Sequence, residues 1–257
     1  MYKILFRKNN SNLDEFKTAS KYFDVTTLRT EANDCTVIPR YSALPFYDEL
    51  CADFWNLNSN VINCVNNFNY IAKFEYYEDI KDFTFKTWFD TTNIPEDIPL
   101  VIKGVTNSKK FYWNTHMYCS NKNDAIKKTF LLQEDSMICD QSIIYRKYEK
   151  LKTFEIGING LPFTNEWRFF YYKNQLIDYG YYWVIADKPE LATISESAKS
   201  MVQDVADIIS NRNNFFSIDV AELETGEWKI VEVNSGEMSG LQSINPETFY
   251  RNLRQHR

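Results

Sequence analysis

Residues 216–234, FSIDVAELETGEWKIVEVN, carry the clearest structural signal in the chain. Two runs rich in β-branched and aromatic residues flank the segment 224–227 (ETGE), and this pattern predicts a β-hairpin. If Thr225 and Gly226 form the centre of the turn, the two strands pair in one fixed register. The predicted facing pairs are Leu223 with Trp228, Ala221 with Ile230, and Asp219 with Glu232.

This register gathers oxygen-bearing side chains on one face of the hairpin. Asp219 faces Glu232, and Asn234 lies two residues further along the same face. Like charges directly opposite each other cost about 0.2–1 kcal/mol, and a hard divalent cation that takes carboxylate and amide oxygens compensates this repulsion. The pattern therefore predicts a metal site at Asp219, Glu232 and Asn234. A solvent-facing hairpin with scattered acidic residues is the alternative interpretation.

Glycine is scarce, with seven among 257 residues. Neither G-x-G-x-x-G nor G-x-x-x-x-G-K-[ST] occurs, which excludes the phosphate-binding loops of Rossmann and P-loop proteins. Three of the seven, Gly226, Gly236 and Gly240, lie in or just after the predicted hairpin, and Gly104 follows Lys103. Because glycine is used where the backbone turns or approaches a ligand closely, we expect these positions to lie near a ligand.

Composition excludes other classes of protein. The two histidines, His116 and His256, have no evident orienting partner, which argues against a Ser-His-Asp or Cys-His nucleophile. Five cysteines without a C-x-x-C pair argue against a zinc ribbon or a disulfide framework and favour a reducing compartment. A net charge of −6 without basic blocks leaves no electrostatic footprint for duplex nucleic acid. With no signal-peptide or membrane-span pattern, we expect a cytoplasmic protein without a membrane partner.

Hydrophobic periodicity divides the chain into two parts. Residues 1–69 alternate short apolar runs with helix-length segments, which predicts a small α/β unit. The remainder, residues 70–257, is richer in strands and contains one amphipathic helix over 195–210 that Ser195 is expected to cap. The strands expected in its second half are 142–148, 166–172, 175–183, 215–223 and 228–233.

The hairpin and the small-residue loop after it, 235–241 (SGEMSGL), resemble the metal-binding end of the ATP-grasp superfamily. Two further segments, Glu166-Trp167-Arg168 and Gly180-Tyr181-Tyr182-Trp183, are similar to a small clade of short, carboxylate-amine ligase-like ATP-grasp proteins. The resemblance covers roughly residues 70–245. It implies an α+β fold in which two α+β subdomains, residues 70–140 and 141–257, clasp ATP. A small α/β N-terminal domain, residues 1–69, precedes them.

The resemblance also implies a role for each of several residues. Asp219, Glu232 and Asn234 would hold magnesium ions that bridge the ATP phosphates. Lys103 resembles the lysine that contacts the α-phosphate, and it is implied to be catalytic. The segment 107–110 (NSKK), which includes Lys110, would be the loop that covers the phosphates, although it lacks the glycines of the commoner version.

Other implied roles concern the nucleotide and the carboxylate. Arg168 is implied to be catalytic and to bind the γ-phosphate or the acyl-phosphate, because a guanidinium matches such oxygens. Its alternative is an ion pair with Glu166, and the alternative for Lys103 is a strand-end lysine that reaches solvent. The remaining implied contacts are Glu149 with the ribose, Arg146 and Ser239 with the carboxylate, and either Lys73 or Lys86 with a phosphate.

The implied activity is an ATP-dependent ligation through an acyl-phosphate, with release of ADP. It would form an amide or thioester bond between a carboxylate and an amine or thiol, and the substrates would be amino acids, peptides or a protein terminus. Two alternatives stay open: a small-molecule kinase on the same fold, and a non-catalytic module in which ATP orders an interaction surface. The presence of all three metal-ligand residues, Asp219, Glu232 and Asn234, disfavours the binding-only alternative.

Overall fold

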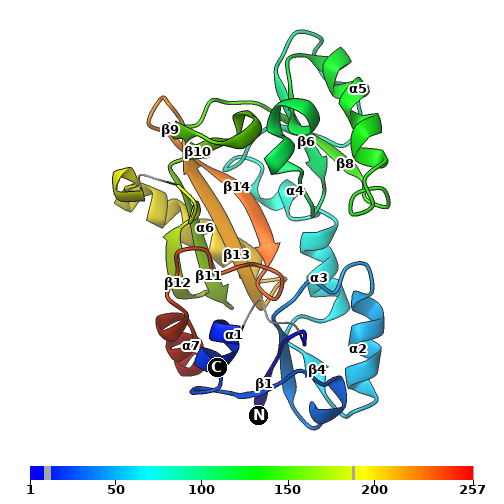
Figure 1. Ribbon diagram of the computed structural model, residues 1–257, viewed down its shortest axis with the longest axis vertical. Helices are drawn as coiled ribbons and strands as arrows, with labels where there is room; N and C mark the ends of the chain where they lie inside the picture. The colour runs from blue at the N-terminus through cyan, green and yellow to red at the C-terminus, as the bar shows by residue number, and fades with distance from the viewer. Residues whose placement is uncertain (9–12, 187–188, 257) are drawn as a thin grey trace.

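The computed structural model describes residues 1–8, 13–186 and 189–256. Figure 1 shows three sheets: an N-terminal sheet and a middle sheet at opposite ends of the molecule, with the C-terminal sheet beside both. Among the described residues, no helix is long and apolar enough to cross a membrane.

The N-terminal sheet is parallel, in the order β2-β1-β3-β4. Its strands are β1 (Tyr2–Leu5), β2 (Asp24–Thr26), β3 (Thr36–Pro39) and β4 (Asn60–Val61). Helices α1 (Leu13–Ala19) and α2 (Tyr47–Trp55) pack on opposite faces, because successive side chains of a strand alternate. Ile4 packs with α1, and Leu5 packs with α2.

Helix α3 (Val65–Ala72) connects this sheet to the rest of the molecule. Phe68 packs in the core of the N-terminal sheet, whereas Tyr70 and Ile71 pack in the core of the C-terminal sheet. The predicted domain boundary at residue 69 therefore falls within a helix that serves both cores. The short helices α4 (Tyr77–Ile80) and η2 (Arg29–Glu31) lie in the connections.

The middle sheet is antiparallel, in the order β5-β8-β6-β7. It consists of β5 (Thr87–Trp88), β6 (Leu100–Gly104), β7 (Tyr118–Cys119) and β8 (Ile143–Lys147), and α5 (Lys122–Gln133) covers one face. Because β8 pairs with β6, residues 143–147 belong to this sheet and not to the second subdomain, in which the sequence interpretation placed them. Two short helices, η3 (Lys110–Tyr112) and η4 (Trp113–Met117), follow β6.

The C-terminal sheet is antiparallel, in the order β12-β11-β13-β14. Its strands are β11 (Glu166–Tyr172), β12 (Gln175–Tyr181), β13 (Phe215–Glu222) and β14 (Trp228–Ser235). Helix α6 (Glu196–Ser210) is capped by Ser195, which accepts a hydrogen bond from the N–H of Ala198, as predicted. The remaining elements are the hairpin of β9 (Thr153–Ile156) and β10 (Pro162–Thr164), the helices η5 (Ile158–Gly160) and η6 (Pro189–Leu191), and α7 (Pro246–Gln255).

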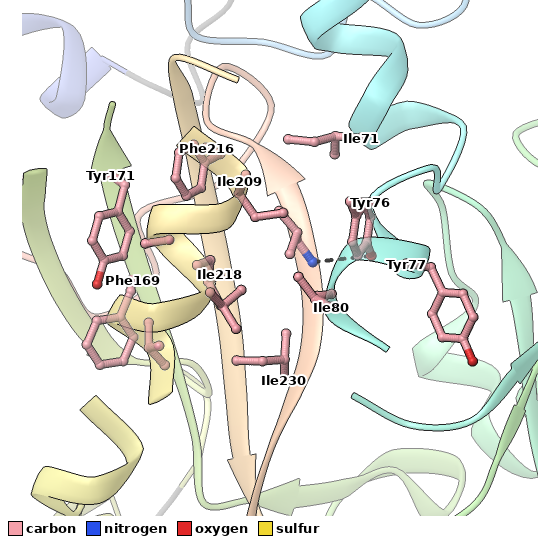
Figure 2. Packing of buried hydrophobic residues seen from close by; sticks show 14 of the residues in the cluster. Ile71, Tyr76, Tyr77, Ile80, Phe169, Tyr171, Ile209, Phe216, Ile218 and Ile230 are labelled. Atoms are coloured by element: carbon pink, nitrogen blue, oxygen red, sulfur yellow. Dashed lines mark hydrogen bonds between the residues drawn. The ribbon is translucent and has the colours of Figure 1, made fainter. Parts of the chain in front are cut away.

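The two faces of the C-terminal sheet differ. One face forms a hydrophobic core with α6, α3 and α4, and Figure 2 shows Ile218, Ile230 and Phe169 in it. The N–H of Val233 donates a hydrogen bond to the Tyr76 hydroxyl at 3.3 Å in this core, and this bond holds β14 against the α4 region. The alternating side chains point the other way, toward the N-terminal and middle sheets.

The register of the β13–β14 hairpin agrees with the prediction at one end only. Asp219 faces Glu232, as predicted. The predicted pairs nearer the turn are wrong, because Ala221 faces Lys229 and Glu222 faces Trp228.

Two irregularities explain this register. The turn closes between Leu223 and Glu227, with Gly226 at a φ of +88°, so the loop is one residue longer than predicted. A β-bulge between Asp219 and Val220 then shifts the pairing back by one residue. The two shifts cancel, and the carboxylates of Asp219 and Glu232 lie opposite each other.

Candidate active site

A cavity lies between the middle sheet and the polar face of the C-terminal sheet. Strand alternation directs Val101 and Lys103 into this cleft, whereas Leu100 and Ile102 pack toward α5. Five of the residues predicted for ATP or metal binding line the cavity: Lys103, Lys110, Arg146, Glu149 and Glu232. Glu166 on β11 also lines it.

Lys103 and Glu232 form an ion pair across the cleft. The Lys103 side chain is 8% exposed and that of Glu232 is 19% exposed, so the pair joins β6 to β14 with limited contact with water. Burial raises the pKa of the Glu232 carboxyl, but the Lys103 ammonium outweighs this effect, and the net pKa is below the ordinary value. Glu232 is therefore held as a carboxylate.

Arg168 and Asp219 form a second, more deeply buried ion pair on neighbouring strands. The guanidinium of Arg168 binds the carboxylate with two hydrogen bonds, Nε to Oδ1 and Nη2 to Oδ2, both at 2.7 Å. Its Nη1 donates to the carbonyl of Gly240 at 3.0 Å. Burial raises the pKa of Asp219 and exceeds the opposing effect of Arg168. The partner of Arg168 is thus Asp219, and not Glu166 as the alternative interpretation had it.

The side chain of Asn234 completes the row of polar groups on this face. Asn234 faces Ser217, one pair further along β13 and β14 than Asp219 and Glu232. No three His, Cys, Asp or Glu side chains of the described chain gather closely enough to hold a metal, so the donor set here is two carboxylates and one amide. Each carboxylate oxygen has two lone pairs and can accept from a cation while it binds a metal. The set therefore fits a hard divalent cation.

Lys110 lies against the aromatic wall of the cleft. Its ammonium donates to the Tyr182 hydroxyl at 2.9 Å and lies 4.7 Å from the centre of the Tyr182 ring. Burial lowers the pKa of Lys110. The helix η3 that carries it contacts η5 across the cleft, where the Asn159 side chain donates to the carbonyl of Phe111 at 2.7 Å. The segment predicted to cover the phosphates thus borders the cleft.

Arg146 and Glu149 line the cavity but have protein partners. The guanidinium of Arg146 donates to the Thr84 hydroxyl at 2.6 Å and to the carbonyl of Val231. Arg146 therefore ties β8 to β14, and its substrate contact stays a prediction. Glu149 pairs with Lys229, at 3.3 Å, near the strand ends.

The other predicted residues lie elsewhere. Lys73 and Lys86 are both exposed, and neither lines the cavity. Ser239 is buried, and its hydroxyl bonds to the Ser217 hydroxyl at 2.8 Å and to the carbonyl of Ser235 at 2.9 Å. Ser239 thus supports the loop after β14, and nothing in this position decides between Lys73 and Lys86 as a phosphate ligand.

Sequence reasoning gave no role to two buried carboxyls. Glu166 accepts a hydrogen bond from the Thr164 hydroxyl at 3.3 Å, and burial beside Asp219 raises its pKa to about 8. Its spacing of two from Arg168 indicates the same face of β11, which is a signal for the cleft. Glu237 accepts a hydrogen bond from Asn63 at 2.9 Å, from a residue far away in the sequence. No local pattern predicts that contact.

The sequence matches one described family over residues 88–253, a family of ATP-grasp domains that is numbered the third of its clade. This range holds most of the middle sheet and the whole C-terminal sheet, including all the ion pairs of the cleft. A comparison with curated proteins found no match.

Several solved structures share the fold. An ATP-grasp RimK domain protein from Sphaerobacter thermophilus is 12% identical, with a TM-score of 0.61 and 98% of each chain covered. D-alanyl-alanine synthetase A from Vibrio cholerae is 12% identical, with a TM-score of 0.58, over 99% of this chain and 96% of that chain. The ATP-grasp ligase PsnB, complexed with precursor peptide PsnA2 and AMPPNP, is 8% identical, with a TM-score of 0.56, over 100% and 98% of the two chains.

Proposed function

This chain belongs to that third clade family of ATP-grasp domains, and from that premise we propose that it is an ATP- and Mg²⁺-dependent carboxylate-amine ligase. The observation that carries the proposal is the polar face of the C-terminal sheet. There, Asp219 and Glu232 lie opposite each other, and each has a cationic partner, Arg168 or Lys103. Phosphoryl transfer needs this combination of fixed cations and oxygen ligands for a metal.

The proposed reaction has two steps. A carboxylate oxygen of the first substrate attacks the γ-phosphorus of ATP, the bond to the β,γ-bridging oxygen breaks, and ADP leaves. An amine then attacks the carbonyl carbon of the acyl-phosphate, phosphate leaves, and the amine nitrogen loses a proton to give the amide. No protein nucleophile is required, in keeping with a sequence that has no evident Ser-His or Cys-His pair.

Each cleft residue has a task in this scheme. The oxygens of Asp219, Glu232 and Asn234 would hold Mg²⁺, which neutralises charge on the phosphate oxygens when it is bound. Lys103 and Arg168 supply fixed positive charge beside that position, and both are nearly buried, so their charges are weakly screened. In the apo chain these two cations neutralise the carboxylates, which keeps the site stable before nucleotide binds.

The substrates that we propose are an amino acid or a peptide. Two of the structures with this fold support that choice by name, a D-alanyl-alanine synthetase and a ligase complexed with a precursor peptide. A small-molecule kinase would use the same first step and stop there. A binding-only module would leave Glu232 and Asp219 without a reaction to serve.

The test is ADP release with Mg²⁺ and ATP over pairs of amino acids and peptides, with mass spectrometry for the new bond. We expect ADP, phosphate and an amide product, and loss of turnover in Glu232→Gln and Asp219→Asn. The matched control is Glu227→Gln, an exposed residue on the same hairpin. A phosphorylated substrate without an amide indicates a kinase, and AMP indicates adenylation. Equal turnover in Glu232→Gln and Glu227→Gln contradicts the metal site.

A further inference from the structure

A second cavity lies at the carboxyl end of the N-terminal parallel sheet. Its walls come from residues that follow three strands: Phe6 and Arg7 after β1, Thr27 after β2, and Tyr41 after β3. In open α/β sheets, ligands bind outside the carboxyl ends of the strands, where the strand order reverses. The order β2-β1-β3-β4 places that reversal between β1 and β3, and the cavity lies there.

The cavity is positively charged. Arg7, Lys8 and Arg29 line it, and none of the described residues in its walls is acidic. Arg29 is partly neutralised by Asp53, whose Oδ2 lies 2.5 Å from Nη1. No ion pair joins Arg7 or Lys8 to any of residues 1–8, 13–186 and 189–256. This part of the protein therefore has unpaired positive charge to offer to an anion.

Arg7 is already oriented in the absence of a ligand. Its Nη2 donates to the carbonyl of Ser42 at 2.7 Å, and its guanidinium lies 5.0 Å from the centre of the Tyr41 ring. A guanidinium has five N–H donors, so further donors remain for a carboxylate. The fixed planar fork reduces the entropy that is lost when an anion binds.

Apolar side chains accompany these charges. Leu5, Ala43, Leu44 and Phe46 also line the cavity. Phe46 is 59% exposed, which is unusual for a large aromatic side chain unless it has a partner surface. A ligand that satisfies both groups carries a carboxylate on an apolar or aromatic stem.

The cavity is connected to the candidate active site through one loop. Met238, four residues after Asn234, packs on the hydrophobic cluster that includes Leu5 and Ala43. Nη1 of Arg40, the residue after β3, donates to the carbonyl of Gly236 in the same loop at 2.6 Å.

We propose that this cavity binds a carboxylate on an apolar stem, as the anchoring end of one of the two ligase substrates. The anchored carboxylate is not the one that reacts. It distinguishes substrates that bear a second acidic group, such as an amino acid acceptor or the C-terminus of a peptide. The substrate role rests on the proposed function, whereas the carboxylate site itself stands on the cavity alone.

The test is an NMR titration of the full chain, without ATP, with N-acetyl-L-phenylalanine up to about 20 mM, a range suited to weak subsites. We expect saturable shifts of the amide signals of Ala43, Leu44 and Phe46. The matched neutral probe is N-acetyl-L-phenylalaninamide, which we expect to bind about tenfold more weakly because the charge-assisted hydrogen bonds are lost. Equal shifts with the two probes, or no saturable shift, would overturn the site.

Variants locate the anion. Arg7→Gln should weaken N-acetyl-L-phenylalanine binding about tenfold, whereas Lys17→Gln, the same change of charge on an exposed residue of α1 outside the cavity, should leave it unchanged. Equal effects of the two variants would show unspecific attraction and refute the site. Because the titration contains no ATP, a failure of ATP binding counts against the ligase proposal alone. Amino acid and peptide carboxylates are then separated by repeating the titration with phenylalanine and with a phenylalanine-terminated tripeptide.

Discussion

The Arg168 guanidinium binds both carboxylate oxygens of Asp219, at 2.7 Å each, although the two side chains are 6% and 1% exposed. An ion pair so far from water is stable only while both members are present, because removal of one leaves a buried charge without a partner. The same geometry positions Arg168 beside the proposed metal. Stability and function therefore depend on one contact between β11 and β13.

The first prediction concerns this pair. Arg168→Met should lower the free energy of unfolding by about 3–5 kcal/mol, because the Asp219 carboxylate stays buried and unpaired. The double variant Arg168→Met/Asp219→Asn should recover part of that loss, since no charge is then left unpaired. Urea unfolding of the wild type, both single variants and the double variant measures the coupling. Additive losses would show that the two side chains do not depend on each other.

The second prediction concerns the two glycines of the loop after β14. A Cβ at Gly236 would lie 2.7 Å from the Phe215 ring, which is fully buried, whereas a Cβ at Gly240 would meet nothing closer than 3.9 Å. Gly236→Ala should therefore cost about 1–3 kcal/mol through overpacking, and Gly240→Ala, its matched control, should be close to neutral. Thermal unfolding compares them. A neutral Gly236→Ala would mean that the loop moves freely away from Phe215.

These glycines also show how far the sequence can be interpreted. Their clustering predicts a ligand beside the loop, and for Gly236 the structure gives a different physical cause, the close approach of Phe215. Gly226 does form the turn, as expected, with a φ of +88°. Packing between β13 and a loop is a tertiary fact that no local pattern encodes.

The hairpin register is a second example. Alternation predicts that Asp219 and Glu232 share a face, and the pairing in the structure is as predicted. The three-residue loop and the bulge beside Val220 leave no sequence signal, because β-bulges depend on twist and on neighbouring strands. Lys103 could be recognised as a strand-end cation, but its pairing with Glu232 joins residues 129 apart, which only the fold reveals.

The third prediction concerns pH. Burial raises the pKa of Glu166 to about 8 from an ordinary value of 4.5, so the folded protein keeps a proton that the unfolded chain releases. The free energy of unfolding should therefore fall as pH rises from about 5 to about 8. Glu166→Gln, which is neutral at every pH, should show a shallower fall, by up to about 1.4 kcal/mol per pH unit. Urea unfolding without nucleotide measures it, with Glu227→Gln as the exposed control. Parallel pH profiles of Glu166→Gln and wild type would contradict the raised pKa.

The fourth prediction concerns Glu237, through which the loop after β14 contacts the N-terminal sheet and its neighbouring helices. Its Oε1 lies 2.9 Å from the Tyr47 hydroxyl, and its Oε2 accepts hydrogen bonds from Asn63 at 2.9 Å and from the Ser235 hydroxyl. The carboxyl is 1% exposed, and burial raises its pKa.

Two substitutions at this position should differ in stability. Glu237→Gln retains the shape and one acceptor, and the Tyr47 hydroxyl can accept from the new amide, so the loss should stay below about 1 kcal/mol. Glu237→Ala leaves buried donors on Asn63 and Ser235 without an acceptor and should cost about 2–4 kcal/mol. Because Ser235 adjoins Asn234, Glu237→Ala should also reduce the rise in melting temperature that Mg²⁺ and ATP produce, at temperatures where the variant is folded. If Glu237→Ala kept the full stabilisation by ATP, the loop would not position Asn234. If Glu237→Gln lost as much stability as Glu237→Ala, the site would require the ionised carboxylate and not merely an acceptor of that shape.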